Sequence, residues 1–130
     1  MTSERSDRPP VLHELESEVM EEVWRQGSAT VREVLHALNE SSGKERAYTT
    51  IMTILSRLER KGVLVRHKQG KGFIYSARAT REEYLEALAE AEVEALVDEF
   101  GEVALVHFAR NLAKLDPSRR EQLRRLARRA

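Results

Sequence analysis

A helix that runs directly into a basic β-hairpin constrains this chain more than any other feature, and it occupies residues 47–75. At about 100° per residue, one side of a helix over 47–61 gathers four aliphatic residues: Ile51, Ile54, Leu55 and Leu58. The opposite side gathers hydroxyl and guanidinium groups: Thr49, Thr50, Thr53 and Arg57, with Arg60 beside them. Solvated helix faces more often mix Glu and Lys. Threonine and arginine instead suit a major groove, where they can contact thymine methyls, phosphates and guanine edges.

The segment after Gly62 has the composition of two short strands. Residues 63–67 and 73–76 are rich in β-branched, aromatic and aliphatic side chains, and a glycine-bearing turn over 68–72 separates them. Three cations then lie on or near a projecting loop that can reach a phosphate backbone: Arg66, Lys68 and Lys71. A helix followed by a basic hairpin is typical of the winged helix-turn-helix. The plainer alternative is a solvated turn kept soluble by its lysines.

The upstream residues predict the rest of a winged domain. Apolar residues recur at helical spacing from Leu12 to Trp24, and Gly27 closes that helix. Residues 30–33 (TVRE) form a capping box that opens a second helix. Residues 39–44 (NESSGK) predict the connector to the Thr-bearing helix. Three helices and a hairpin in about 70 residues make a complete small core, in which Trp24 is expected to be a packing residue.

The last third predicts a separate helical module. A second capping box, TREE, starts a helix at residues 80–83, and Asp116-Pro117 starts the last one. Between them, a helix over 103–113 is apolar around much of its circumference, which is typical of a buried partner interface. We therefore expect a two-fold symmetric dimerisation module; the alternative is a helical cap on a monomer. Its expected contact residues are Leu85, Leu88, Leu96, Val103, Leu105, Val106, Phe108, Leu112, Leu123 and Leu126.

The expected fold is thus mainly α with a small β-hairpin. A loose arm over 1–10 precedes a winged-helix domain over 11–79 and a three-helix dimerisation module over 80–130. No apolar run approaches the roughly 20 residues of a membrane span and no signal peptide opens the chain, so we expect a cytoplasmic protein without membrane insertion. The chain has no cysteine and its four histidines are scattered. We expect no metal, no cofactor and no catalysis.

A net charge of zero conceals three blocks of charge. Residues 41–81 carry ten cations and two acids, a net charge of +8. Residues 82–102 carry nine acids and no cation, and the residues after Val103 carry eight cations and two acids, a net charge of +6. The first basic block coincides with the proposed reading elements, as an electrostatic footprint on nucleic acid should. The Arg-rich tail either answers the acidic block or forms a second DNA-binding patch.

The chain resembles the BlaI/MecI-type penicillinase repressors, a family of bacterial winged-helix regulators. The resemblance is carried by Glu18-Val-Met20 and Trp24, by residues 30–34 (TVREV), and by residues 47–62 with the pattern YTT-x-MT-x-L-x-RL-x-x-KG. It covers residues 12–78 strongly and the last third weakly. It implies a homodimer that represses transcription on a palindromic double-stranded operator, read by the helix 48–61 and the wing 63–76. The implied DNA-contact residues are Thr49, Thr50, Thr53 and Arg57, and the basic flanks add Arg46, Arg60, Arg66, Lys68 and Lys71. The chain departs from the family pattern at Ser17, where many relatives have Trp, and at His13, where a Ser or Thr cap is usual.

The resemblance also implies a release mechanism. In antibiotic-responsive members of the family, a membrane sensor metalloprotease triggers cleavage at an Asn-Phe pair in the dimerisation module, which switches on β-lactam-response genes. His107-Phe108 is the matching pair here, with the Phe kept and the Asn replaced. The absence of cysteine separates the chain from copper-sensing relatives. Two rival functions stay open: a protein–protein adaptor built on a winged domain, and a winged regulator with a small-molecule effector.

Overall fold

The computed structural model describes residues 9–129, apart from the side chain of Ser42. The expected N-terminal arm, residues 1–10, lies outside the described residues except for Pro9 and Pro10. The chain divides into two compact units, residues 1–89 and residues 90–130. This boundary lies ten residues after the expected one at 79/80, and the long helix α5 (Arg81–Phe100) contributes to both units.

Three helices form the core of the first unit: α2 (Glu14–Gln26), α3 (Val31–Ser42) and α4 (Tyr48–Arg60). Local chemistry sets their ends. The Thr30 hydroxyl accepts from the Glu33 N–H at 3.2 Å, and the Glu33 carboxylate accepts from the Thr30 N–H at 2.8 Å, so the predicted capping box is confirmed. Gly27 ends α2 with a φ of 86°, which a residue without Cβ adopts at little cost. The buried core joins all three helices to the sheet through Val19, Met20, Val23, Ala29, Val34, Leu38, Ile51, Ile54, Leu55, Leu58, Val63, Leu64 and Tyr75.

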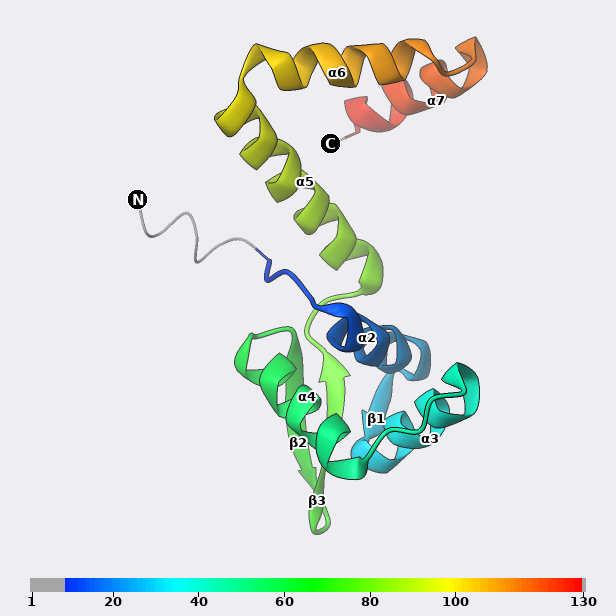
Figure 1. Ribbon diagram of the computed structural model, residues 1–130, viewed down its shortest axis with the longest axis vertical. Helices are drawn as coiled ribbons and strands as arrows, with labels where there is room; N and C mark the ends of the chain where they lie inside the picture. Colours follow the sequence, from blue (N-terminus) through cyan, green and yellow to red (C-terminus); the bar gives the residue numbers. More distant parts are fainter. Residues whose placement is uncertain (1–8, 130) are drawn as a thin grey trace. The chain divides into compact units, whose positions relative to one another are not determined.

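A three-stranded antiparallel sheet completes this unit, in the order β1-β3-β2. The predicted hairpin is present as β2 (Leu64–Gln69) and β3 (Gly72–Ala77), and Gly70 lies at the turn with a φ of 61°. A glycine first in a two-residue loop is typical of type II′ hairpins. The strand β1 (Ser28–Thr30) was not predicted, because three residues are too few to show a strand alternation. It pairs with β3, placing the buried Ala29 opposite Tyr75. Figure 1 shows the hairpin running beside α4, with its tip at the same end of the unit as the start of α4.

The first turns of α5 belong to this unit because an aromatic cluster ties them to α2. The rings of Trp24 and Tyr84 lie 5.6 Å apart, and the Trp24 indole N–H donates to the Ala79 carbonyl at 3.0 Å. The Tyr84 hydroxyl donates to the Pro10 carbonyl, and burial together with the negative charge of Glu16 raises the pKa of Tyr84. Trp24 thus packs against the core, as its position in the sequence predicted.

The second unit contains the last half of α5, α6 (Glu102–Ala113) and α7 (Pro117–Arg128). Gly101 separates α5 from α6, with a φ of 59°. Asp116 caps α7 by accepting from the Arg119 N–H at 2.8 Å, and Pro117 occupies the first helical position, as predicted. Among the described residues of this unit, Ala104 is the one buried apolar residue.

Candidate nucleic-acid interface

The two sides of α4 differ as the sequence predicted. Ile51, Ile54, Leu55 and Leu58 are buried against the core. The other side carries Thr49, Thr50, Thr53 and Arg57, all of them exposed. Since α4 is supported along its whole apolar side, its hydroxyl and guanidinium groups are presented on a rigid surface.

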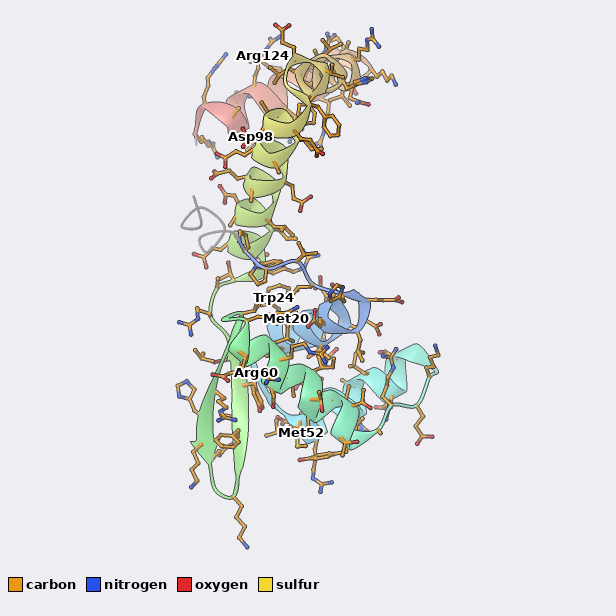
Figure 2. The ribbon with its side chains drawn as sticks, turned by 60° about the vertical axis from the view of Figure 1, so that its left-hand side comes forward. Met20, Trp24, Met52, Arg60, Asp98 and Arg124 are labelled. Atoms are coloured by element: carbon orange, nitrogen blue, oxygen red, sulfur yellow. The ribbon has the colours of Figure 1, made fainter. Side chains whose placement is uncertain are left out.

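Sequence reasoning missed three residues beside this face. Tyr48 and Met52 are both 41 % exposed, and they stand one turn apart on α4 next to Thr49 and Thr53. The Arg32 guanidinium carbon lies 5.4 Å from the centre of the Tyr48 ring, which brings the first turn of α3 to the same surface. The sequence signal that could have found them is a methionine, Met52, among the threonines of α4. Methionine is not favoured on a helix face that only contacts solvent. Figure 2 shows Met52 near one end of α4 and Arg60 near the other.

The hairpin carries its cations on exposed backbone beside α4. Arg66 and Lys68 alternate with His67 along β2, and Lys71 lies in the turn. The Arg66 guanidinium carbon is 4.3 Å from the centre of the half-exposed Phe73 ring, so the ring supports it. In the described part of the chain, neither Lys68 nor Lys71 forms an ion pair, so both remain available to an anionic partner.

The two remaining predicted cations differ in accessibility. Arg60 is exposed, whereas the Arg46 side chain is only 18 % exposed and lies 3.5 Å from the Glu18 carboxylate. The Asn39 side chain also holds the backbone of Arg46: its carbonyl accepts from the Arg46 N–H at 2.7 Å and its amide donates to the Arg46 carbonyl at 3.2 Å. Arg46 therefore fixes the entry to α4 and does not stand free on the exposed face.

A buried carboxylate lies behind the exposed face. Glu16 is 1 % exposed and accepts from the Lys61 ammonium at 2.8 and 2.9 Å. Burial alone raises the pKa of Glu16, but hydrogen bonds from the His13 backbone N–H and from Lys61 outweigh it, so the net pKa lies below the usual value. The His13 backbone N–H donates to the Glu16 carboxylate at 2.9 Å, which is the half of a capping box that the third residue of the helix supplies.

Other kinds of site find little support in residues 9–129. No group of three or more His, Asp or Glu side chains in this range is arranged to hold a metal ion. No helix in the same range combines the length and apolarity that crossing a membrane requires.

An exposed Thr/Arg helix beside a basic hairpin, on a three-helix core, defines a winged-helix DNA-binding regulator. The sequence profile of the penicillinase repressor family matches residues 12–129. The chain therefore belongs to the penicillinase repressor family, and the resemblance inferred from the sequence is confirmed.

Individual relatives agree with this assignment. The penicillinase repressor of Bacillus licheniformis is 35 % identical over 77 residues, which are 59 % of this chain and 59 % of that protein. The transcriptional regulator BlaI of Mycobacterium tuberculosis is 36 % identical over 103 residues, which are 75 % of this chain and 70 % of that protein. The solution structure of the DNA-binding domain of the repressor BlaI is 34 % identical with a TM-score of 0.51, and the match covers 59 % of this chain and 92 % of that domain.

Proposed function

We propose that this protein is a cytoplasmic, dimeric transcriptional repressor that binds a palindromic operator through α4 and the β2–β3 hairpin. The observation that carries the proposal is the exposed Thr/Arg face of α4, which stands beside the unpaired lysines of the hairpin. Hydroxyls and guanidinium groups discriminate base edges, whereas lysines on a turn contact phosphates without regard to sequence. The Thr49, Thr50, Thr53 and Arg57 face is therefore the reading element, and Arg66, Lys68 and Lys71 add affinity.

The apolar surface of the second unit supports the dimer. Leu105 is 52 % exposed and Val103 is 60 % exposed, although both lie on a helix with few polar residues. Large exposed apolar patches on a single chain mark interaction surfaces. The other exposed members are Val93, Leu96, Phe100, Val106, Leu112 and Leu126, while Phe108 and Leu123 are half-buried. Of the expected contact residues, Leu85 and Leu88 lie in the first unit, so the dimer contact proposed here uses the residues after Ala89.

Selection from random duplexes, combined with the mass of the complex in solution, tests this function. The full-length protein is expected to enrich a short inverted repeat with half-sites about one helical turn apart, and to bind it as two chains per duplex. Enrichment of a single half-site by one chain would contradict the dimer. A uniform pool after selection would contradict base reading, and would favour a protein–protein adaptor.

Salt dependence separates the repressor from that adaptor. Phosphate-binding cations release counterions, so retention on random duplex or heparin should fall steeply as salt rises. An adaptor would show acidic or mainly apolar residues on the exposed face of α4, where this chain has three threonines and Arg57 with Tyr48 and Met52 beside them. Salt-independent retention would favour the adaptor.

The proposed release step is proteolysis at His107-Phe108, triggered by a membrane sensor metalloprotease in response to a β-lactam. His107 is exposed in the middle of α6, and its carbonyl accepts from the Asn111 side chain at 2.9 Å. Cleavage there divides α6 and removes half of its apolar surface from the dimer contact.

Chromatin capture with and without a β-lactam, combined with mass spectrometry of the protein, tests this step. The expected result is binding near β-lactamase or sensor genes in untreated cells. After β-lactam treatment this binding should be lost and a new 1–107 fragment should appear. Intact protein that stays bound would exclude the antibiotic circuit and leave the repressor function standing.

A further inference from the structure

Glu16 is the one buried charged side chain among the described residues of the chain. A buried carboxylate is costly unless its charge and its lone pairs are satisfied. Here one oxygen accepts from both the His13 N–H and Lys61, and the other oxygen accepts from Lys61. That second oxygen also lies 4.0 Å from Nη1 of Arg57, within ion-pair reach but beyond a hydrogen bond.

The partners of Glu16 belong to the last turn of the reading helix. Lys61 is the C-cap of α4, and Arg57 lies one turn earlier, with its side chain 47 % exposed. At the opposite end of α4, the reciprocal hydrogen bonds between Asn39 and Arg46 fix the entry to the helix. The reading helix is therefore held by a polar contact at each end, in addition to its apolar side.

Two cations share the Glu16 carboxylate, with Lys61 close to it and Arg57 farther away. Lys61 makes both short contacts and neutralises most of the carboxylate charge. Arg57 faces the remaining charge at 4.0 Å, the limit of ion-pair distance, and makes no hydrogen bond to the carboxylate. A side chain ordered before binding loses less conformational entropy when it contacts its target.

We propose that Glu16 is a positioning residue for base reading: with Lys61 it locks the end of α4, and it orders the Arg57 guanidinium before DNA binds. The proposal rests on the proposed function of α4 as the reading helix. It extends that function by assigning part of the sequence discrimination to a carboxylate that cannot itself reach the DNA.

The full-length protein tests the proposal first without DNA. The variant E16Q K61M removes the lock and keeps the net charge of the chain unchanged, while E14Q makes the same amide change on an exposed residue of the same helical turn. In wild type and E14Q, the ¹⁵N relaxation of the Arg57 Nε–H should show a restrained side chain. In E16Q K61M its order parameter should fall towards that of a free surface arginine. An Arg57 equally mobile in all three proteins would overturn the proposal.

Binding then shows whether the lock acts through Arg57. On a duplex selected by the wild-type protein, E16Q K61M should lose about tenfold in affinity, and on a scrambled duplex its affinity should change less than about twofold. In an R57A background the same pair of changes should have little further effect, because coupled residues are not additive. Equal losses with and without Arg57 would overturn the proposal, since the lock would then act on the fold alone.

A second variant covers the possibility that the double variant unfolds. E16D keeps the charge and withdraws it from α4 by one methylene, so it should fold and lose part of the Arg57 order and part of the discrimination. If the Arg57 side chain in E16D is as ordered as in the wild type, and base discrimination is unchanged, the positioning role of Glu16 is contradicted. If R57A leaves the sequence preference intact while Arg57 is more ordered in the wild type than in E16Q K61M, base reading by Arg57 fails and only the ordering of Arg57 by Glu16 stands.

Discussion

At the scale of single residues, the proposed interface combines side chains suited to discriminating bases with side chains suited to attracting phosphates. Arg57 lies on the exposed face of α4, 4.0 Å from the Glu16 carboxylate, while Lys71 lies in an exposed two-residue turn. A fixed guanidinium can distinguish a guanine edge from other bases, but a mobile ammonium senses only the phosphate charge. Substitutions of Arg57 and Lys71 should therefore change DNA binding in different ways.

Replacing Arg57 and Lys71 separately tests this division. Arg57→Ala should cost about 1–3 kcal/mol on the selected duplex and broaden the base preference. Lys71→Ala should weaken specific and scrambled duplexes alike and lower the slope of log affinity against log salt by about one. Fluorescence anisotropy over a salt series on both duplexes measures both effects. Identical profiles for the two variants would contradict base reading by this face.

The lowered pKa of Glu16 leads to a prediction about the stability of the fold at acid pH. A carboxyl whose pKa is lower in the folded state stabilises the fold above its unfolded pKa, near 4.5, and that stabilisation is lost as the pH falls through the folded value. The urea midpoint of the wild type should therefore decline below about pH 4.5, and the E16Q midpoint should decline less. The pKa of Glu22 is also lowered, by a hydrogen bond from Arg25, so E22Q should reduce the acid decline in the same direction. An unchanged acid limb in E16Q would contradict the assigned shift.

At the scale of elements, the sequence carried the information for the helices far better than for the shortest strand. The Thr30, Thr80 and Asp116 starts are local chemistry, readable within four residues. The strand β1 forms by pairing with β3, which lies more than 40 residues later in the chain. No local sequence pattern therefore predicts it. The late unit boundary has a similar cause, since Tyr84 joins the first unit through Trp24, 60 residues upstream.

In the candidate interface, too, local patterns were predictable from the sequence and long-range contacts were not. The two faces of α4 depend on helix periodicity alone and were predicted. Glu16 is paired with Lys61 and Arg46 with Glu18; both are contacts of α2 with residues that flank α4, which sequence spacing does not reveal. Tyr48 and Met52 were missed because aromatic and thioether groups in a helix are by default assigned to the core.

The capping box of α3 gives a prediction at this scale. Thr30→Ala removes the oxygen that accepts from the Glu33 N–H and should lower the free energy of unfolding by about 1 kcal/mol. Thr53→Ala makes the same chemical change within the exposed face of α4 and should leave stability unchanged or slightly higher, because alanine favours helix. Urea unfolding followed by circular dichroism compares them. An equal loss in both variants would show that the cap does not stabilise the fold.

At the scale of the whole molecule, the two units have opposite characters. The first has a closed core of three helices and a sheet, whereas the described residues after Ala89 leave most of their large apolar side chains exposed. A winged domain can fold on its own core, whereas the proposed dimer would cover the exposed apolar residues of the second unit. Folding and assembly should therefore be separable by mutation.

Leu105→Glu tests that separation. A carboxylate in the apolar contact would be desolvated without a partner, so the protein should become monomeric at micromolar concentration. Affinity for the full inverted repeat should fall towards that for a half-site, while the winged domain stays folded. Gln122→Glu, which adds the same charge at an exposed polar position of α7, should change neither property. Light scattering and anisotropy measure both, and a dimeric Leu105→Glu variant would place the contact elsewhere.

Because Trp24 is the sole tryptophan of the chain, the molecule carries its own optical label. Its indole donates to the Ala79 carbonyl and leans on the Tyr84 ring, at the place where the first turns of α5 meet α2. Emission from this ring should shift to longer wavelength when those turns separate from α2 and water reaches it. Excitation at 295 nm, where tryptophan absorbs, would therefore follow this joint in the unmodified protein, during DNA binding or proteolysis, without an attached dye.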